Sequence, residues 1–160
     1  MQAVPDILVR PSRPDDHAAL RDVLYDTFES TWRPQITPEA ALAFVSEDRP
    51  AAYVNRRGAE FWVAERGGAV VGLAHWRGDF VHALHVRGAH ARAGVGSRLM
   101  DEAEAAIAAA GHAQARLETD TFNLRSQAFY AARGYCGAGR YPDEEWASGL
   151  TTLLLVKPLR

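Results

Sequence analysis

FVHALHVRGAHARAGVGSRLM, residues 80–100, is the stretch that decides the fold of this 160-residue chain. Its first part, Phe80 to Val86, is rich in β-forming residues and predicts a strand. From Gly94 to Ala110 the apolar residues recur at three- and four-residue steps, which is the period of a helix, and Gly111 is placed to end that helix. The stretch therefore predicts a strand, a loop of small residues and a long helix.

The loop between this strand and this helix suits an anion. A glycine-bearing loop that opens a helix gathers free backbone N–H groups and the positive end of the helix dipole, as a phosphate or pyrophosphate requires. A dinucleotide-binding fingerprint would need a small residue where Leu99 stands, and a Walker A loop would need lysine after Gly96. An isolated Gly-x-Gly more often makes only a tight turn, so the phosphate interpretation depends on the rest of the chain.

The residues before this stretch predict three strands and two helices. Gly67 and Gly68 form a hairpin loop, which makes the last two of these strands and Phe80–Val86 an antiparallel meander. The predicted elements are a strand Ile7–Arg10, a helix that ends near Phe28, a second helix from Thr37-Pro38, and strands Glu60–Glu65 and Ala69–Arg77.

The residues after it predict a strand Ala113–Thr119, a helix Asn123–Arg133 closed by Gly134, and strands Tyr135–Tyr141 and Leu150–Val156. The order is then β, α, α, β, β, β, α, β, α, β, β. This order favours an α/β (α+β) architecture around one sheet, in one domain over residues 1–160.

Composition excludes several classes of partner. The formal net charge is −2 and no dense Lys/Arg run is present, so we expect neither nucleic acid nor an anionic membrane surface as partner. The only cysteine, Cys136, cannot form an intrachain disulfide and suits a reducing compartment. Neither a signal peptide nor a membrane span is recognisable, so a cytoplasmic location is expected.

Two motifs resemble those of the GNAT superfamily of acetyl-CoA-dependent N-acetyltransferases. Leu84-His85-Val86 followed by Gly94-Val95-Gly96-Ser97 resembles its acyl-CoA signature, in which Gln/Arg-x-x-Gly-x-Gly/Ala opens the long helix. The position of the usual Gln or Arg is Ala91, with arginine one place later at Arg92. Asn123-x-x-Ser126-x-x-Phe129-Tyr130, followed by Gly134-Tyr135, resembles the later GNAT pattern, with serine where alanine is commoner.

The resemblance implies a mixed, mostly antiparallel sheet of about seven strands flanked by about four helices. It also implies acetyl-CoA as co-substrate and no metal. Whether the Arg92 side chain binds the phosphate that alanine at position 91 cannot reach stays open. The implied acetyl-CoA-binding residues are Leu84, His85, Val86, Ala91, Arg92, Ala93, Gly94, Val95, Gly96, Ser97, Asn123, Arg125 and Tyr130.

Within this resemblance, Tyr130 matches the general acid, and main-chain N–H groups around Leu84 to Val86 match the oxyanion site. A phenol has an ordinary pKa of about 10 and can donate a proton to a thiolate. Glu118, five residues before Asn123, matches the base of GNAT enzymes that acetylate protein N-termini, but a solvated strand glutamate fits equally well. The rival bases are His75 and His82, and strand alternation places His82 on the face of Leu84, opposite to His85.

The acceptor pocket of this superfamily commonly uses the loop between the first two helices and the strands near the C-terminus. These segments carry aromatic and acidic residues that suit a cationic amine, although core packing explains them equally well. The acceptor is then a small-molecule or peptide amine of unidentified kind, and the alternative is a noncatalytic acyl-CoA-binding or regulatory module. The oligomeric state, monomer or homodimer, stays open. The candidate acceptor residues are Phe28, Glu29, Trp32, Tyr141, Asp143, Glu144, Glu145 and Trp146, with His75 and His82.

Overall fold

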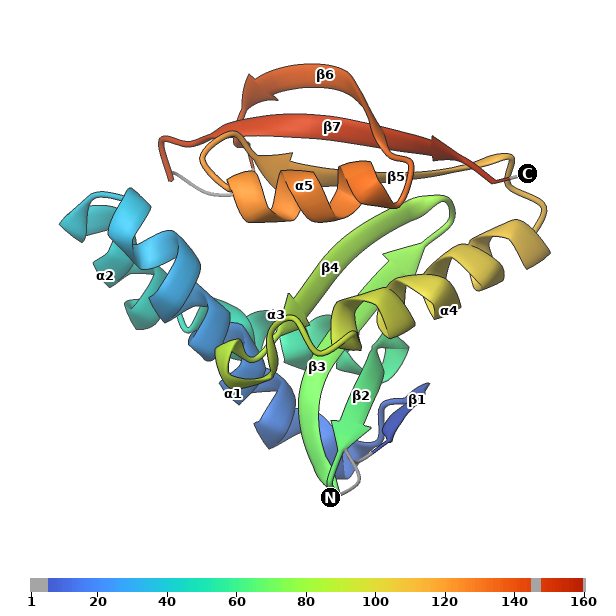
Figure 1. The fold of residues 1–160 in the computed structure, drawn as a ribbon. Coiled ribbons are helices and arrows are strands. Elements are labelled where there is room, and N and C mark those ends of the chain that lie inside the picture. The colour runs from blue at the N-terminus through green and yellow to red at the C-terminus, as the bar shows by residue number, and fades with distance from the viewer. Residues whose placement is uncertain (1–5, 145–147, 160) are drawn as a thin grey trace.

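One seven-stranded sheet runs through the chain in the order β1-β2-β3-β4-β5-β7-β6 (Figure 1). A computed structural model describes residues 6–144 and 148–159. All neighbouring strands are antiparallel except β4 and β5, which are parallel. The strands are β1 (Ile7–Pro11), β2 (Trp62–Arg66), β3 (Ala69–Arg77), β4 (Phe80–Val86), β5 (Gln114–Asp120), β6 (Cys136–Pro142) and β7 (Thr151–Pro158).

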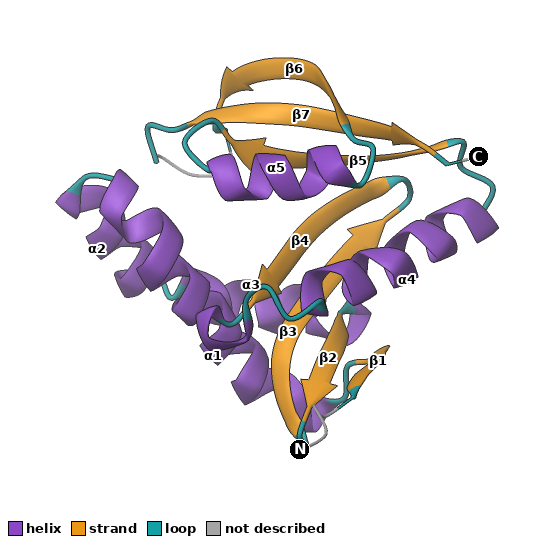
Figure 2. Cartoon of the chain, viewed as in Figure 1, coloured by secondary structure: helices purple, strands orange, loops and turns teal. Residues whose placement is uncertain are grey.

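Helices cover both faces of the sheet (Figure 2). On one face α1 and α3 bury Leu20, Val23 and Val54 against β2–β4, and on the other α4 and α5 pack on the remaining apolar side chains. Within the described residues, none of the helices combines the length and apolar character that a membrane span needs. The helices are α1 (His17–Thr27), α2 (Pro38–Ser46), α3 (Arg49–Arg57), α4 (Val95–Ala109) and α5 (Leu124–Ala132).

The predicted architecture and element order are confirmed, with one helix more than expected. The additional helix is α3, which is amphipathic but short, with Pro50 in its first turn, and which the sequence interpretation missed. The Asp48 side chain begins it by accepting a hydrogen bond from the Ala51 N–H. The strand expected from Glu60 begins at Trp62, because Gly58–Glu60 form a 3₁₀ turn.

A β-bulge in β4 changes the direction of His82. Ala83 pairs with His75 and Val81 pairs with Trp76, so His82 is an extra residue in β4. His82 therefore lies on the α3 face, where its ring stacks on His75 at 5.4 Å. The expectation that His82 shares the face of Leu84, opposite to His85, is wrong, because that expectation assumed uninterrupted alternation.

The parallel pair β4–β5 is unusually short. Only Phe80 and Val81 of β4 pair with Arg116 and Leu117 of β5. Beyond them the two strands diverge, as Figure 1 shows. The sheet is thus split on one side, and the backbone of residues 82–86 has no β5 partner within the described residues.

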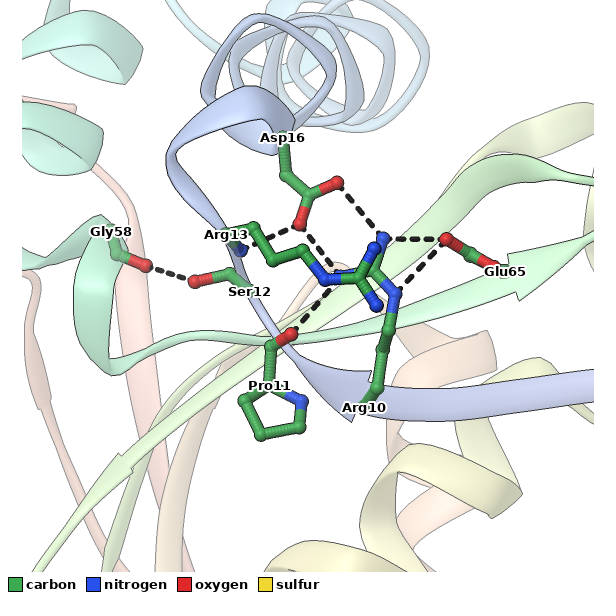
Figure 3. Close-up of polar contacts among 7 residues, drawn as sticks. All are labelled: Arg10, Pro11, Ser12, Arg13, Asp16, Gly58 and Glu65. Atoms are coloured by element: carbon green, nitrogen blue, oxygen red, sulfur yellow. Dashed lines mark hydrogen bonds and ion pairs between the residues drawn. The ribbon is translucent and has the colours of Figure 1, made fainter.

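A buried ion-pair cluster joins the first strand to the rest of the fold (Figure 3). The Arg10 guanidinium on β1 lies between the carboxylates of Asp16, before α1, and Glu65 on β2. Asp16 also accepts a hydrogen bond from the Arg13 N–H at 2.7 Å. The Arg10 side chain holds the pKa of the Asp16 carboxyl below its usual range, so Asp16 stays charged although it is buried.

We expect Arg10→Met to lower the free energy of unfolding by about 3 kcal/mol, because it leaves the buried Asp16 carboxylate without its cation. Methionine keeps an apolar stem of similar length, so the decrease in the free energy of unfolding measures the loss of the guanidinium charge. Urea unfolding measures it. The matched control, Asp101→Asn, breaks an exposed contact to Arg133 and should cost less than about 1 kcal/mol. Equal decreases in the free energy of unfolding of the two variants would contradict a stabilising role of the Arg10–Asp16 ion pair.

Candidate active site

A continuous cleft of about 1330 Å³ passes through the split between β4 and β5. On the α4–α5 face it is bounded by the loop before α4 and by α5. On the opposite face it is bounded by the segments around α1, α2 and α3 and by the end of β5. The cleft thus connects the predicted anion site with the predicted acceptor side.

The start of α4 forms the cradle expected from the sequence. Gly94 adopts a φ of +86°, and Arg92 adopts a φ of +61°. The first intrahelical bond runs from the Arg98 N–H to the Gly94 carbonyl, and no acceptor among the described residues occupies the N–H groups of residues 95–97. These groups and the positive helix end face the cleft, which is the chemistry that a phosphate needs.

Most of the side chains expected around this cradle line the cleft. Arg92 and Arg125 are exposed on the cleft and form no ion pair with the described residues. A Cβ on Gly96 would lie 3.4 Å from the Phe129 ring, so glycine there allows close packing of α4 on α5. Ala91 lines the cleft as well, whereas Ala93 does not.

Tyr130 is a buried residue that lines the cleft. Its side chain comes from α5, is 7% exposed and packs edge-on against Phe129 and Tyr135. None of the described residues forms a hydrogen bond with its hydroxyl. Burial raises the pKa of this phenol above its ordinary value, so the hydroxyl keeps its proton at neutral pH.

Asn123 caps α5. Its Oδ1 accepts a hydrogen bond from the Ser126 N–H at 3.1 Å. The Ser126 hydroxyl lies 2.8 Å from the Thr119 hydroxyl on β5, which fixes the helix to the strand. Asn123 and Tyr130 both line the cleft, as their spacing of two turns predicts.

Two carboxylates project from one face of β5 into the cleft. Glu118 is exposed and accepts a short hydrogen bond from the Tyr141 hydroxyl. Asp120 is less exposed and accepts a hydrogen bond from the Trp32 indole N–H at 2.7 Å. Burial raises the pKa of Asp120, and the nearby charges of Asp143 and Glu118 act in the same direction. Sequence reasoning missed Asp120, although strand alternation places it beside Glu118.

The histidines occupy three different environments. His82 lines the cleft, and partial burial lowers its pKa. His75 is buried off the cleft, between the Tyr53 hydroxyl at 2.6 Å and the Glu60 carboxylate at 3.4 Å. His85 lies beside the Thr27 hydroxyl, and burial lowers its pKa to about 4. A group with so low a pKa is a poor base at neutral pH.

The acceptor side has an aromatic wall. The chain after α1 forms a π-helical turn, Phe28–Trp32, which places Phe28 and Trp32 on the cleft. The Phe28 ring stacks on Phe44 at 3.8 Å. Glu29 does not line the cleft and forms an ion pair with Arg33.

The remaining acceptor candidates divide into three groups. Asp143 lines the cleft, whereas Tyr141 and Glu144 are absent from its described lining. Glu145 and Trp146 lie outside the described residues. The structure thus brings Phe28, Trp32, His82 and Asp143 together on the cleft, but not Glu29 or His75.

The profile of the Acetyltransferase (GNAT) family matches residues 18–135. The chain therefore belongs to the GNAT acetyltransferase family, whose members are transferases, and the resemblance seen in the sequence is confirmed. A search of curated proteins finds no match.

Solved structures with the same fold include three of interest. A GCN5-related N-acetyltransferase from Rhodopseudomonas palustris has a TM-score of 0.78 and 23% identity, with 99% of each chain covered. The PaiA N-acetyltransferase from Thermoplasma acidophilum, solved with coenzyme A, has a TM-score of 0.74 and 16% identity, with 96% of this chain and 99% of that chain covered. YncA from Salmonella typhimurium, solved with acetyl-CoA, has a TM-score of 0.68 and 18% identity, with 97% and 95% covered. At these identities the likeness concerns the fold.

We expect the His85 imidazole to stay neutral from about pH 8 to about pH 5, because its buried site disfavours the charged form. Imidazole NMR of the folded protein, with the His85→Asn variant to assign the signal, tests this. The His85 chemical shifts should be constant over that range. A titration with a midpoint near the ordinary value of about 6.5 would contradict the buried, neutral state.

Proposed function

We propose that this protein is an N-acetyltransferase that transfers an acetyl group directly from acetyl-CoA to a primary amine. The observation that carries the proposal is the Tyr130 hydroxyl, which lines the cleft with the anion cradle and the β5 carboxylates, has no hydrogen-bond partner among the described residues and belongs to a side chain that is 7% exposed. Two proteins of the same fold are solved with coenzyme A or acetyl-CoA, which supports this donor.

The residues of the cradle fit the donor. The N–H groups of residues 95–97 and the Arg92 side chain would hold the pyrophosphate, with Arg125 available to a further phosphate. The side of β4 that lacks a β5 partner at Leu84, His85 and Val86 would hold the acyl arm. Ala91 and Asn123 contribute to the wall of the cleft. Bound acetyl-CoA supplies an activated thioester carbonyl.

Side chains and backbone groups of the protein would then carry out the proton transfers and stabilise the oxyanion. Tyr130 holds a proton at neutral pH and can give it to a leaving thiolate. Main-chain N–H groups of β4, freed by the split from β5, can stabilise an oxyanion. The amine must lose a proton, and Glu118 or a water held by His82 would take it, since both side chains line the cleft. His75 is unsuited to direct contact because it lies off the cleft.

We expect acetyl-CoA to bind in the micromolar range that is usual for enzyme substrates. Arg92→Ala should weaken binding about tenfold, because it removes one charge-assisted hydrogen bond to a phosphate. Calorimetry measures both. Arg13→Ala, which removes an exposed arginine that does not line the cleft, is the control and should leave the affinity unchanged. Absence of any binding to the wild-type protein would contradict the proposed donor.

We expect Tyr130→Phe to keep acetyl-CoA affinity but to lower kcat by about 100-fold or more, because the variant removes the proton donor and keeps the ring. The assay is release of free CoA over a panel of amines, with calorimetry of the same preparations. Unchanged turnover would remove Tyr130 from the mechanism. Binding of acetyl-CoA without transfer to any amine would favour the noncatalytic module instead.

A further inference from the structure

The wall of the cleft formed by the end of β5 is acidic. Asp120 lies at its centre, with Glu118 two residues before it on the same face and Asp143 nearby across the β6–β7 end of the sheet. Residues two apart on a strand are separated by about 6.6 Å, so Glu118 and Asp120 present two negative charges at that spacing. The Tyr130 side chain is 7% exposed, its hydroxyl has no hydrogen-bond partner among the described residues, and it lines the same cleft as this acidic wall.

The charge of Asp120 is uncompensated within the described residues. Its hydrogen-bond partner is the neutral Trp32 indole, and no Lys, Arg or His side chain of that part of the chain lies within ion-pair distance. The neighbours that act on its pKa by charge are both carboxylates, Asp143 and Glu118. A partly buried carboxylate without a cation is costly, and a cationic ligand would remove that cost.

The nearby arginines are engaged or lie elsewhere. Arg33 pairs with Glu29, and Arg116 pairs with Asp79. Arg49 and Arg56 line the cleft from α3 and leave Asp120 outside ion-pair distance. The cleft therefore has an acidic β5 wall, and any cation that neutralises Asp120 there comes from the ligand.

The Trp32 indole fixes the orientation of Asp120. The indole N–H donates a hydrogen bond to Asp120 Oδ2 at 2.7 Å, and none of the described residues donates one to Oδ1. The Trp32 ring also lines the cleft, next to the stacked rings of Phe28 and Phe44. Aromatic faces beside a carboxylate form a favourable surface for an ammonium group on an alkyl chain.

We infer that Asp120, oriented by Trp32, binds a second ammonium group of the acceptor, so that the acceptor is a diamine or polyamine. This inference rests on the proposed acetyltransferase function. The amine that reacts gives its proton to Glu118 or to a water and attacks the thioester carbonyl. The distant ammonium keeps its charge throughout and serves only to position the chain.

A matched set of acceptors isolates this ammonium. Putrescine, pentylamine and δ-aminovalerate share one primary amine and four methylene groups, and they end in an ammonium, a methyl and a carboxylate respectively. We expect kcat/KM for putrescine to exceed that for pentylamine by at least about tenfold, the ratio that a charge-assisted contact to a buried carboxylate gives. δ-Aminovalerate should be the poorest of the three.

Variants identify the residue responsible. Asp120→Asn keeps the size of the side chain and should raise KM for putrescine about tenfold, with kcat nearly unchanged and pentylamine unaffected. Trp32→Phe keeps a ring but removes the indole N–H that orients Asp120. Because Trp32 is a positioning residue, this variant should raise KM for putrescine by a smaller factor than Asp120→Asn does. Asp22→Asn, on the exposed face of α1 and outside the cleft, is the control and should match the wild type.

The outcomes separate this inference from the proposed function. Turnover of all three amines with equal kcat/KM, or preference for δ-aminovalerate, would overturn the inference and leave the acetyltransferase proposal intact. An equal decrease with all three amines in Asp120→Asn would also overturn it. If no amine is acetylated, the proposed function fails. The inference about Asp120 is then tested by calorimetry of putrescine binding to the CoA-saturated protein. Binding that Asp120→Asn abolishes supports the inference, and absence of binding to the wild type overturns it.

Discussion

The divergence of β4 from β5 after a single two-residue pairing is the constraint on which the site depends. A parallel pair would normally continue along both strands, and its interruption exposes backbone N–H and C=O groups on the open side of β4. The sheet tolerates this because β4 pairs with β3 along its length except at the His82 bulge, and β5 keeps its full pairing with β7. The cradle, Tyr130 and the two β5 carboxylates all lie along the resulting opening.

Burial keeps the ionisable groups in the middle of this opening uncharged. It keeps Tyr130 protonated and His85 neutral, so neither places a net charge in the centre of the cleft. The charged groups differ between the two sides. Arg92 and the free N–H groups of α4 supply positive potential on the donor side. On the other side Glu118, Asp120 and Asp143 make the β5 wall negative, while Arg49 and Arg56 line the cleft from α3. An anionic donor and a cationic acceptor would therefore enter from opposite faces of the sheet.

Local sequence patterns were sufficient for the parts of the fold and site that depend on neighbouring residues. The strand, loop and helix of residues 80–110 follow from a change of period, and the end of α5 follows from Gly134. Helix α3 was missed although its own residues are amphipathic; it is short and has Pro50 in its first turn. Two features could not be read locally. The bulge at His82 is defined by the register of β4 on β3. The Trp32–Asp120 contact joins residues 88 positions apart.

The two carboxylates of β5 show how environment separates roles that sequence leaves equivalent. Glu118 is exposed, so a proton that it accepts can pass to water, as a base needs to regenerate itself. Asp120 is more enclosed and is held by Trp32, so its position is fixed and exchange with solvent is restricted. A fixed carboxylate is better suited to hold a charge than to shuttle a proton. Under the proposed function, the strand would hold a base and an anchor two residues apart, and the contact from Trp32, which the π-helical turn carries, would distinguish them.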